Sequence, residues 1–431
     1  MKRVLPSRSA PAVAAFFVMI PALLTAQQSL TWDQVKARFE AANPALKADA
    51  LGVDEMKAAE VTAFLRPNPG IGLSSDGLQI APHTTPGLGT HWLPLTGDQL
   101  VPSINYLHER EHKRELRLQS AKEGTQIAGS QHEDLERNLL FDLRSQFVQT
   151  LQAKAVLELA KADLAYYDKI IEISRSRYKD GDIAQIDLDR IVLLRVQYEA
   201  EIQTAIVNLR TSKIQLLQLL DDSTPVEQFD VTGPFDFNDD LKPLEEFRKI
   251  ALDERPDLRA ALESIEQAQT NHKLAISNGS ADPTFSTWYS YNPAFNNPFG
   301  RYTLGASVSV PLRIFDRNQG EKQRTLIDID RNKELTEGAR AQVFSDVDSA
   351  YAQVESSITL LKPYKAEYRG LATHVRDTVT YSYNQGGASL MDFLNAQSDY
   401  RAVQLAYLQL IGSYLTAAGQ LNLAVGREVI Q

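Results

Sequence analysis

The chain has 431 residues, a formal net charge of −10 and no cysteine. The negative charge argues against a nucleic-acid-binding protein, because such proteins neutralise phosphates with basic side chains. The lack of cysteine excludes a disulfide framework, a thiolate metal site and an acylated N-terminal cysteine. No nucleophile motif, phosphate-binding loop or pair of catalytic carboxylates is evident, so we expect a protein that is not an enzyme and binds no cofactor.

The first 26 residues differ from the rest of the chain. A basic start is followed by an apolar run at residues 12–24 and by small residues before Gln27. This pattern predicts an export signal over residues 1–26. No later run reaches the roughly 18 apolar residues that a membrane helix needs. A contact with a membrane would therefore have to be made by strands or by a surface segment.

The remaining chain divides into two similar halves, residues 27–224 and 225–431, joined by a linker over about 221–255. Each half predicts a helix, two short strands, a very long helix, a tight turn and a return helix. In the first half these are a helix over 31–65, strands over about 68–80 and 93–104, a long helix over 105–179 and a return over 185–220. In the second they are a helix over 256–277, strands over about 283–291 and 301–312, a long helix over 318–384 and a return over 390–425.

An internal repeat supports this division. The stretch Tyr178–Asp187 aligns with Tyr383–Asp392, and in both a glycine follows the tyrosine after two residues. Similarity between distant segments indicates one structural unit used twice. Apolar residues spaced alternately three and four apart, over 157–174 and 403–424, predict coiled-coil packing of the long helices. A solvent-exposed dimeric coiled coil would also show this spacing, but it would explain neither the strands nor the repeat.

The predicted strands alternate between apolar and small polar residues. Leu304 and Val308 fall on one face, and Ser307 falls on the other. Strands of about ten residues with this alternation are typical of outer-membrane barrels. Four strands cannot close a barrel, so either they pack on a soluble body or several chains pool them. Three chains would supply twelve.

The signal, the duplicated plan and the two Tyr-x-x-Gly turns, each with an Asp six residues after the Gly, resemble the TolC-like outer-membrane efflux factors. The segment 308–320, VSVPLRIFDRNQG, is most similar to the subgroup that serves cobalt–zinc–cadmium efflux. The resemblance implies a mainly α protein with a small β part. Its strands, four per chain, would form a trimeric outer-membrane β-barrel that continues into a long periplasmic α-helical barrel.

The resemblance also implies a function. Such a protein is the exit duct of a tripartite efflux system, located in the outer membrane with a periplasmic extension and in contact with outer-membrane lipid. It would pass substrate, here heavy-metal cations, from a periplasmic adaptor and an inner-membrane pump to the exterior. Two ducts of the same fold are alternatives, one for drug efflux and one for type I protein secretion. A soluble periplasmic coiled-coil scaffold is a third reading.

By resemblance, the two helix turns form the periplasmic tip that contacts the adaptor. The residues that match this tip are Arg177, Tyr178, Gly181, Asp182, Ile183, Ala184, Tyr383, Gly386, Gly387, Ala388 and Ser389. Asp392 and Asn395 match the positions that line the pore constriction. A threefold axis would turn Asp392 into a ring of carboxylates that attracts cations and raises their apparent pKa values. The alternative is that Asp392 only caps the helix that follows the turn.

His108 and His112 are four residues apart, a spacing that can bind a metal on one face of a helix. Because no third ligand is evident, and because Glu109 and Glu111 adjoin them, a solvated face is the preferred reading. We therefore predict no metal site.

Overall fold

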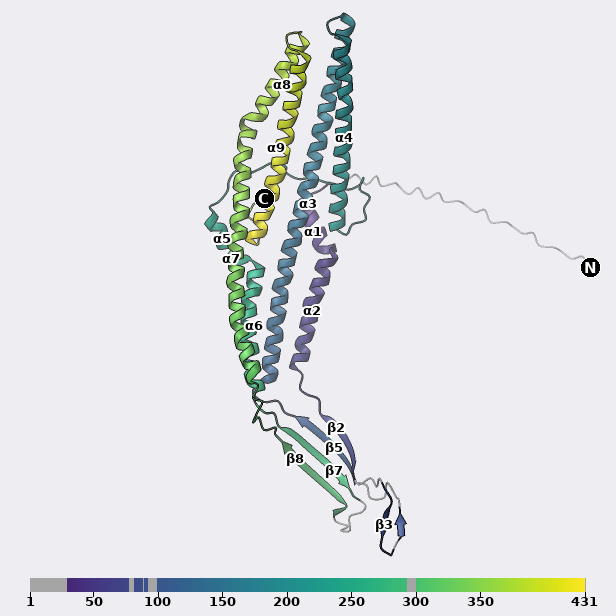
Figure 1. The fold of residues 1–431 in the computed structure, drawn as a ribbon, viewed down its shortest axis with the longest axis vertical. Helices are drawn as coiled ribbons and strands as arrows, with labels where there is room; N and C mark the ends of the chain where they lie inside the picture. The colour runs from purple at the N-terminus through teal and green to yellow at the C-terminus, as the bar shows by residue number, and fades with distance from the viewer. Residues whose placement is uncertain (1–28, 77–80, 88, 92–98, 293–299, 431) are drawn as a thin grey trace, which may run out of the picture.

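The computed structural model describes residues 29–76, 81–87, 89–91, 99–292 and 300–430. These residues form an elongated molecule, with long helices at one end and a β-sheet at the other (Figure 1). The predicted signal lies outside the described residues, as do the end of the predicted strand 68–80 and the start of the strand 93–104. Among the residues described, no helix combines the length and the apolar character needed to cross a bilayer.

The described helices and strands follow the predicted order. The helices are α1 (Trp32–Ala42), α2 (Pro44–Phe64), α3 (Lys113–Asp180), α4 (Gln185–Leu219), α5 (Leu244–Glu254), α6 (Pro256–Asn278), α7 (Gln319–Pro363), the π-helix η2 (Tyr364–Tyr368), α8 (Arg369–Asn384) and α9 (Leu390–Val425). The strands are β1 (Ser29–Leu30), β2 (Gly70–Asp76), β3 (His83–Thr85), β4 (Gly89–His91), β5 (Gln99–Leu107), β6 (Asp230–Val231), β7 (Thr284–Tyr291) and β8 (Tyr302–Ser309).

Two predicted helix boundaries were wrong. The helix predicted over 31–65 is two helices, because Pro44 has no N–H and the Asn43 side chain accepts hydrogen bonds from the first turn of α2. The long helix begins at Lys113 rather than at 105, because β5 continues to Leu107 and His112 has a φ of 54°. Residues 105–107 pair with β7, so tertiary pairing decided their conformation.

Two further regions differ from the prediction. The second long helix is not a single α-helix, because the π-turn η2 interrupts it directly after Pro363. A proline inside a helix removes one backbone hydrogen bond, which accounts for a local change of helix type at this point. The predicted linker 221–255 contains α5 and the short strand β6, which pairs in parallel with β1 near the N-terminus.

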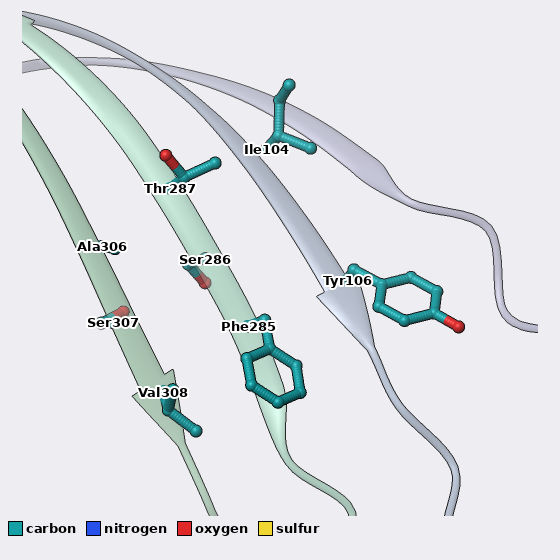
Figure 2. Close-up of a pocket in the computed structure, with 8 residues that line it drawn as sticks. All are labelled: Ile104, Tyr106, Phe285, Ser286, Thr287, Ala306, Ser307 and Val308. Atoms are coloured by element: carbon teal, nitrogen blue, oxygen red, sulfur yellow. The ribbon is translucent and has the colours of Figure 1, made fainter.

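The main sheet has the strand order β2-β5-β7-β8, and all neighbours are antiparallel. Its register places Phe285 opposite Val308 and Tyr289 opposite Leu304, so the apolar residues share one face as predicted. This face is largely exposed, with Leu304 at 81%. A hollow of about 440 Å³ lies on it, and Phe285 and Val308 are among the side chains that line it (Figure 2).

The helices pack around α3, which contacts α2 nearer the sheet and α4 nearer the turns (Figure 1). In the second half, α6 and α9 flank α7 and α8 in the same way. One buried cluster includes Val347, Val354 and Tyr414, and it joins α7 to α9 and α5. Another surrounds Phe39 and Phe147 and joins the N-terminal segment to α3 and α4.

A partly buried cluster of charges joins β6 to α3 and α4 in the middle of the molecule. Asp230, on β6, accepts from Lys154 Nζ at 2.6 Å and lies 3.0 Å from Lys213 Nζ. Lys213 is 8% exposed and also donates to the carbonyl of Phe229. Burial alone would raise the pKa of Asp230, but the two lysines outweigh it and hold the pKa below the usual 3.8.

We expect Asp230→Asn to lower the free energy of unfolding by about 3 kcal/mol at pH 7, because Lys213 would stay buried without its counter-ion. A carboxyl with a depressed pKa stabilises the fold above its unfolded pKa and loses this effect as pH falls through its folded pKa. The difference between wild type and variant should therefore persist at neutral pH and shrink only below about pH 4. Denaturant unfolding followed by circular dichroism measures the free energy of unfolding of wild type and variant at each pH. An unchanged midpoint at pH 7 would contradict the prediction.

Candidate functional site at the helix turns

The turns between α3 and α4 and between α8 and α9 lie at the same end of the molecule, far from the sheet (Figure 1). Gly181 and Gly386 have φ angles of 85° and 77°, a region that residues with a side chain rarely adopt. Both turns use the same hydrogen bonds: Asp182 N to Arg177 O and Gly387 N to Ser382 O at 2.8 Å, and Gly181 N to Tyr178 O and Gly386 N to Tyr383 O at 3.1 Å. Each glycine thus ends its helix in the same way.

The structure brings all the predicted tip residues to this end but does not expose them equally. The exposed ones are Tyr178, Gly181, Asp182, Ala184, Gly386, Gly387 and Ser389, and the half-buried ones are Arg177, Ile183 and Ala388. Tyr383 is only 4% exposed, and burial raises the pKa of its hydroxyl. It packs in a cluster with Tyr167, Ile191 and Phe393 that joins the two turns, so it contributes to the packing beneath the tip.

Arg177 reaches from the first turn to the second. Its guanidinium donates to the backbone carbonyl of Tyr383 at 2.7 Å and lies 5.0 Å from the centre of that ring. The ring of Tyr383 in turn stacks on Phe393 at 5.1 Å. The sequence predicted Arg177 as an outward contact and did not predict this link between the turns, because residues distant in sequence form it.

Asp392 is exposed in the isolated chain and caps α9. Its carboxylate accepts from Ser389 Oγ at 2.7 Å and from Ser389 N at 3.1 Å, and Ser389 Oγ accepts from Asp392 N. These hydrogen bonds hold the pKa of Asp392 below its usual value. The cap that the sequence offered as an alternative to pore lining is therefore present. Asn395 is also exposed, one helical turn further on.

The first turn has no matching cap. Asp187 occupies the position in α4 that Asp392 occupies in α9, but the residue before the first turn of α4 is Ala184, which has no side-chain oxygen. A capping box needs a hydroxyl or carboxyl at this place. The two turns therefore share a backbone conformation and differ in side-chain chemistry.

A seam of charged and aromatic residues joins the two hairpins below the turns. Arg376 lies over the rings of Tyr166 and Tyr400, at 4.7 and 3.9 Å. Arg401 pairs with Glu201 at 2.6 Å, and the hydroxyl of Tyr166 donates to Thr380 at 3.0 Å. Sequence reasoning missed this seam. Its only signal was the presence of arginines and tyrosines inside otherwise apolar coiled-coil spacing.

Asp163, on α3, is half-buried in this seam. Burial raises the pKa of its carboxyl to about 6, although Arg401 and Arg376 act in the opposite direction. A carboxyl whose pKa is higher in the folded state binds its proton more tightly there than in the unfolded chain. The seam is therefore less stable when Asp163 is ionised than when it is protonated.

His108 and His112 do not lie on one face of a helix, so the assumption that their spacing was helical was wrong. His108 directly follows β5 and lies near the rings of Tyr106 and Phe285, whereas His112 precedes α3 with its side chain 86% exposed. In the part of the chain that the structure describes, no group of three or more His, Asp or Glu side chains is placed to hold a metal ion.

We expect the stability of the seam to fall as pH rises from about 4 to 6, by up to about 3 kcal/mol, because Asp163 ionises in that window. Asp163→Asn should remove this dependence and exceed the wild type in stability at pH 8. Hydrogen exchange of residues 160–171, corrected for intrinsic rates, measures the effect. Asp168→Asn on the same helix, where the carboxylate is 44% exposed and pairs with Arg195, is the matched control. Equal protection of wild type and Asp163→Asn at pH 8 would contradict the prediction.

Known proteins share this fold and part of this sequence. The protein CusC, solved in a study of folding and transmembrane channel formation, superposes with a TM-score of 0.74 at 15% identity, over 98% of this chain and 99% of that one. The cobalt-zinc-cadmium resistance protein CzcC of Cupriavidus metallidurans is 21% identical over 73% of this chain and 74% of its own length. Nodulation protein T of Rhizobium leguminosarum bv. trifolii is 24% identical over 66% of this chain and 62% of its own.

Residues 248–427 match the family described as "Outer membrane efflux protein". An efflux protein moves its substrate without converting it, which agrees with the expectation that the chain is not an enzyme. The description of this family agrees with the predicted location in the outer membrane. This match runs from within α5 to the end of α9, and the fold of the whole chain superposes on solved outer-membrane channels.

Proposed function

We propose that the chain forms the passive exit duct of a tripartite efflux system and that it conducts heavy-metal cations. The observation that supports this most directly is the separation of two surfaces in one elongated chain. A sheet with an exposed apolar face lies at one end, and two exposed helix turns lie at the other (Figure 1). A duct between a membrane and a periplasmic partner requires both surfaces, on opposite ends of a rigid body.

The sheet supports assembly from several chains. Its outer strands β2 and β8 pair on one side only within the described residues, so each presents a row of backbone groups. An open edge cannot persist in lipid, because the unsatisfied groups would cost several kcal/mol each. Pairing β8 of one chain with β2 of the next removes both edges. Three chains then close a barrel of twelve strands, an even number within the range of such barrels.

The helices support the same assembly. On α4, four exposed apolar side chains lie seven or fourteen residues apart: Ile186, Leu193, Val207 and Ile214, between 47% and 70% exposed. A line of apolar residues at heptad spacing is the pattern by which one helix packs along another. A second copy of the chain would cover this line and extend the two hairpins into a helical barrel.

In such a trimer the helix turns would contact a periplasmic adaptor, which connects to an inner-membrane pump. The exposed tip residues Tyr178, Asp182 and Ser389 offer a phenol, a carboxylate and a hydroxyl to that partner. Arg177 would mainly link the two turns, since it already binds the carbonyl of Tyr383. The internal duplication would give the trimer six turns in one plane, and the matched hydrogen bonds of the two turns support it.

Asp392 would line the narrowest part of the duct, with Asn395 one turn further along α9. The exposed carboxylate would form a ring of three around the axis, which attracts cations and repels anions. Its like charges would counteract the effect of Ser389, which lowers the pKa in the isolated chain. Metal cations are proposed as the substrate because CzcC is named for cobalt, zinc and cadmium resistance.

Purified protein in planar bilayers should form cation-selective channels, and Asp392→Asn should reduce that selectivity several-fold because the ring loses its charge. Asparagine retains a side-chain oxygen that can cap α9, so the turn should stay folded. Asp187→Asn, at the equivalent place in the first turn, is the matched control and should conduct like the wild type. Unchanged selectivity in Asp392→Asn would remove this residue from the constriction.

Deletion of the gene should lower tolerance to zinc, cobalt and copper and leave tolerance to a panel of dyes unchanged. The expected cause is the loss of the last conduit for cations that the pump collects. Loss of dye tolerance with intact metal tolerance would contradict the cation assignment and favour a duct for drugs. Restoring the gene as the Asp230→Asn variant, which we expect to be less stable, would show how far reduced stability alone lowers metal tolerance.

A further inference from the structure

The segment between β8 and α7, residues 310–317, exposes an unusual amount of apolar surface. Leu312 is 81% exposed, Ile314 60% and Phe315 89%. Single exposed apolar residues are common, but a contiguous patch normally marks a surface that contacts a partner or a membrane. The patch directly continues β8, whose residues Leu304 and Val308 are 81% and 60% exposed.

The segment is held in one conformation by its own polar groups. The Asp316 carboxylate accepts from the backbone N–H of Asn318 at 2.9 Å, and Gln319 Nε2 donates to the carbonyl of Phe315 at 3.1 Å. Arg317 Nε donates to the carbonyl of Arg313 at 3.2 Å. Several backbone groups are therefore satisfied within the loop, which lets it lie at a low-polarity boundary.

The loop is also fixed to the end of α6. Asn318, with a φ of 61°, donates from its side chain to the carbonyl of Ala275 at 2.7 Å. A Cβ on Gly279 would lie 2.8 Å from the carbonyl oxygen of Arg317, so only glycine permits this approach. The exposed apolar side chains are thus presented from a rigid base.

The length of β8 indicates what covers the patch. Outer-membrane barrels carry an apolar band about 25 Å tall on strands tilted by about 40°. At about 3.3 Å per residue, the eight residues of β8 span only about 20 Å along the membrane normal. Continuing the strand direction from Val310 to Leu312 supplies the rest of the height of the apolar band. Ile314 and Phe315 then fall at the edge of the hydrocarbon layer, and Arg313 and Arg317 fall among the headgroups.

We propose that residues 312–317 form an anchor that binds phospholipids of the periplasmic leaflet. Leu312, Ile314 and Phe315 enter the boundary between headgroups and acyl chains, while Arg313 and Arg317 bind the phosphates. The ion pair of Arg313 with Asp316 is long, at 3.9 Å, so a phosphate can compete with this carboxylate for the guanidinium. Arginines at this depth match the tendency of long basic side chains to place their charge among the headgroups while their stems contact apolar surface. The anchor rests on the proposed orientation of the sheet in the outer membrane.

The lack of native cysteine permits a direct test with one spin label at a time. Phe315→Cys, Leu304→Cys on β8 and Lys333→Cys on α7 are labelled in the full-length protein. Each is reconstituted in vesicles of phosphatidylethanolamine and phosphatidylglycerol. Power saturation then compares collisions with oxygen, which concentrates in lipid, and with a water-soluble nickel chelate. We expect the ratio of oxygen to nickel collisions to be highest at 304, intermediate at 315 and lowest at 333.

Two outcomes would overturn the anchor. A label at 315 that both reagents fail to reach would mean that a neighbouring chain covers the loop. A label as open to nickel as the one at 333 would place the loop in water. The label at 304 separates this test from the proposed duct. If that label is also in water, the sheet is not in the membrane, whereas lipid contact at 304 without lipid contact at 315 rejects the anchor alone.

Discussion

A single uninterrupted helix determines how the rest of this chain is arranged. The 68 residues of α3 span about 100 Å, and no other helix in the described part of the chain is as long. Shorter helices must pair along it in succession, so α2 covers the part nearer the sheet and α4 the part nearer the turns. Contacts of α3 with α6 and α9 then attach the second half to the first. The strands are consequently carried to one end and the turns to the other.

This arrangement places polar groups where two halves of the chain meet. Asp230 with its two lysines joins the linker to α3 and α4, and the seam around Asp163 joins the hairpins below the turns. The two sites have opposite electrostatic properties. Lysines stabilise the ionised form of Asp230, whereas burial destabilises the ionised form of Asp163. At neutral pH the ionised Asp230 therefore stabilises the middle of the molecule, whereas the ionised Asp163 destabilises the seam below the turns.

The proposed duct and the proposed lipid anchor follow from the same geometry. In the described part of the chain the edges and the apolar face of the sheet have no partner, and in a bilayer neighbouring chains and lipid would cover them. The loop at residues 310–317 lies where the sheet passes into the helices, and its rigid base on α6 ties the depth of the sheet to the position of the helices. At the opposite end, Asp392 and Arg177 have different structural roles in the turns. One caps α9 beside the proposed constriction, and the other binds the two turns together.

The sequence by itself determined the order of the elements, the two glycine turns and the alternation of the strands. These features depend on local periodicity and on backbone conformations that only glycine adopts readily. Return helix α9 was predicted at its observed bounds, Leu390–Val425. The repeated motif also marked the two turns as equivalent, and their backbone hydrogen bonds match.

Only the tertiary structure decided which of those residues face outward. Residues 105–107 became strand because β7 pairs with them, and Arg177 turned toward Tyr383 because the second hairpin lies beside the first. The elevated pKa of Asp163 likewise arises from burial between helices that are more than two hundred residues apart in sequence. Local patterns specify each helix and strand, but contacts between distant segments set the surroundings of each side chain.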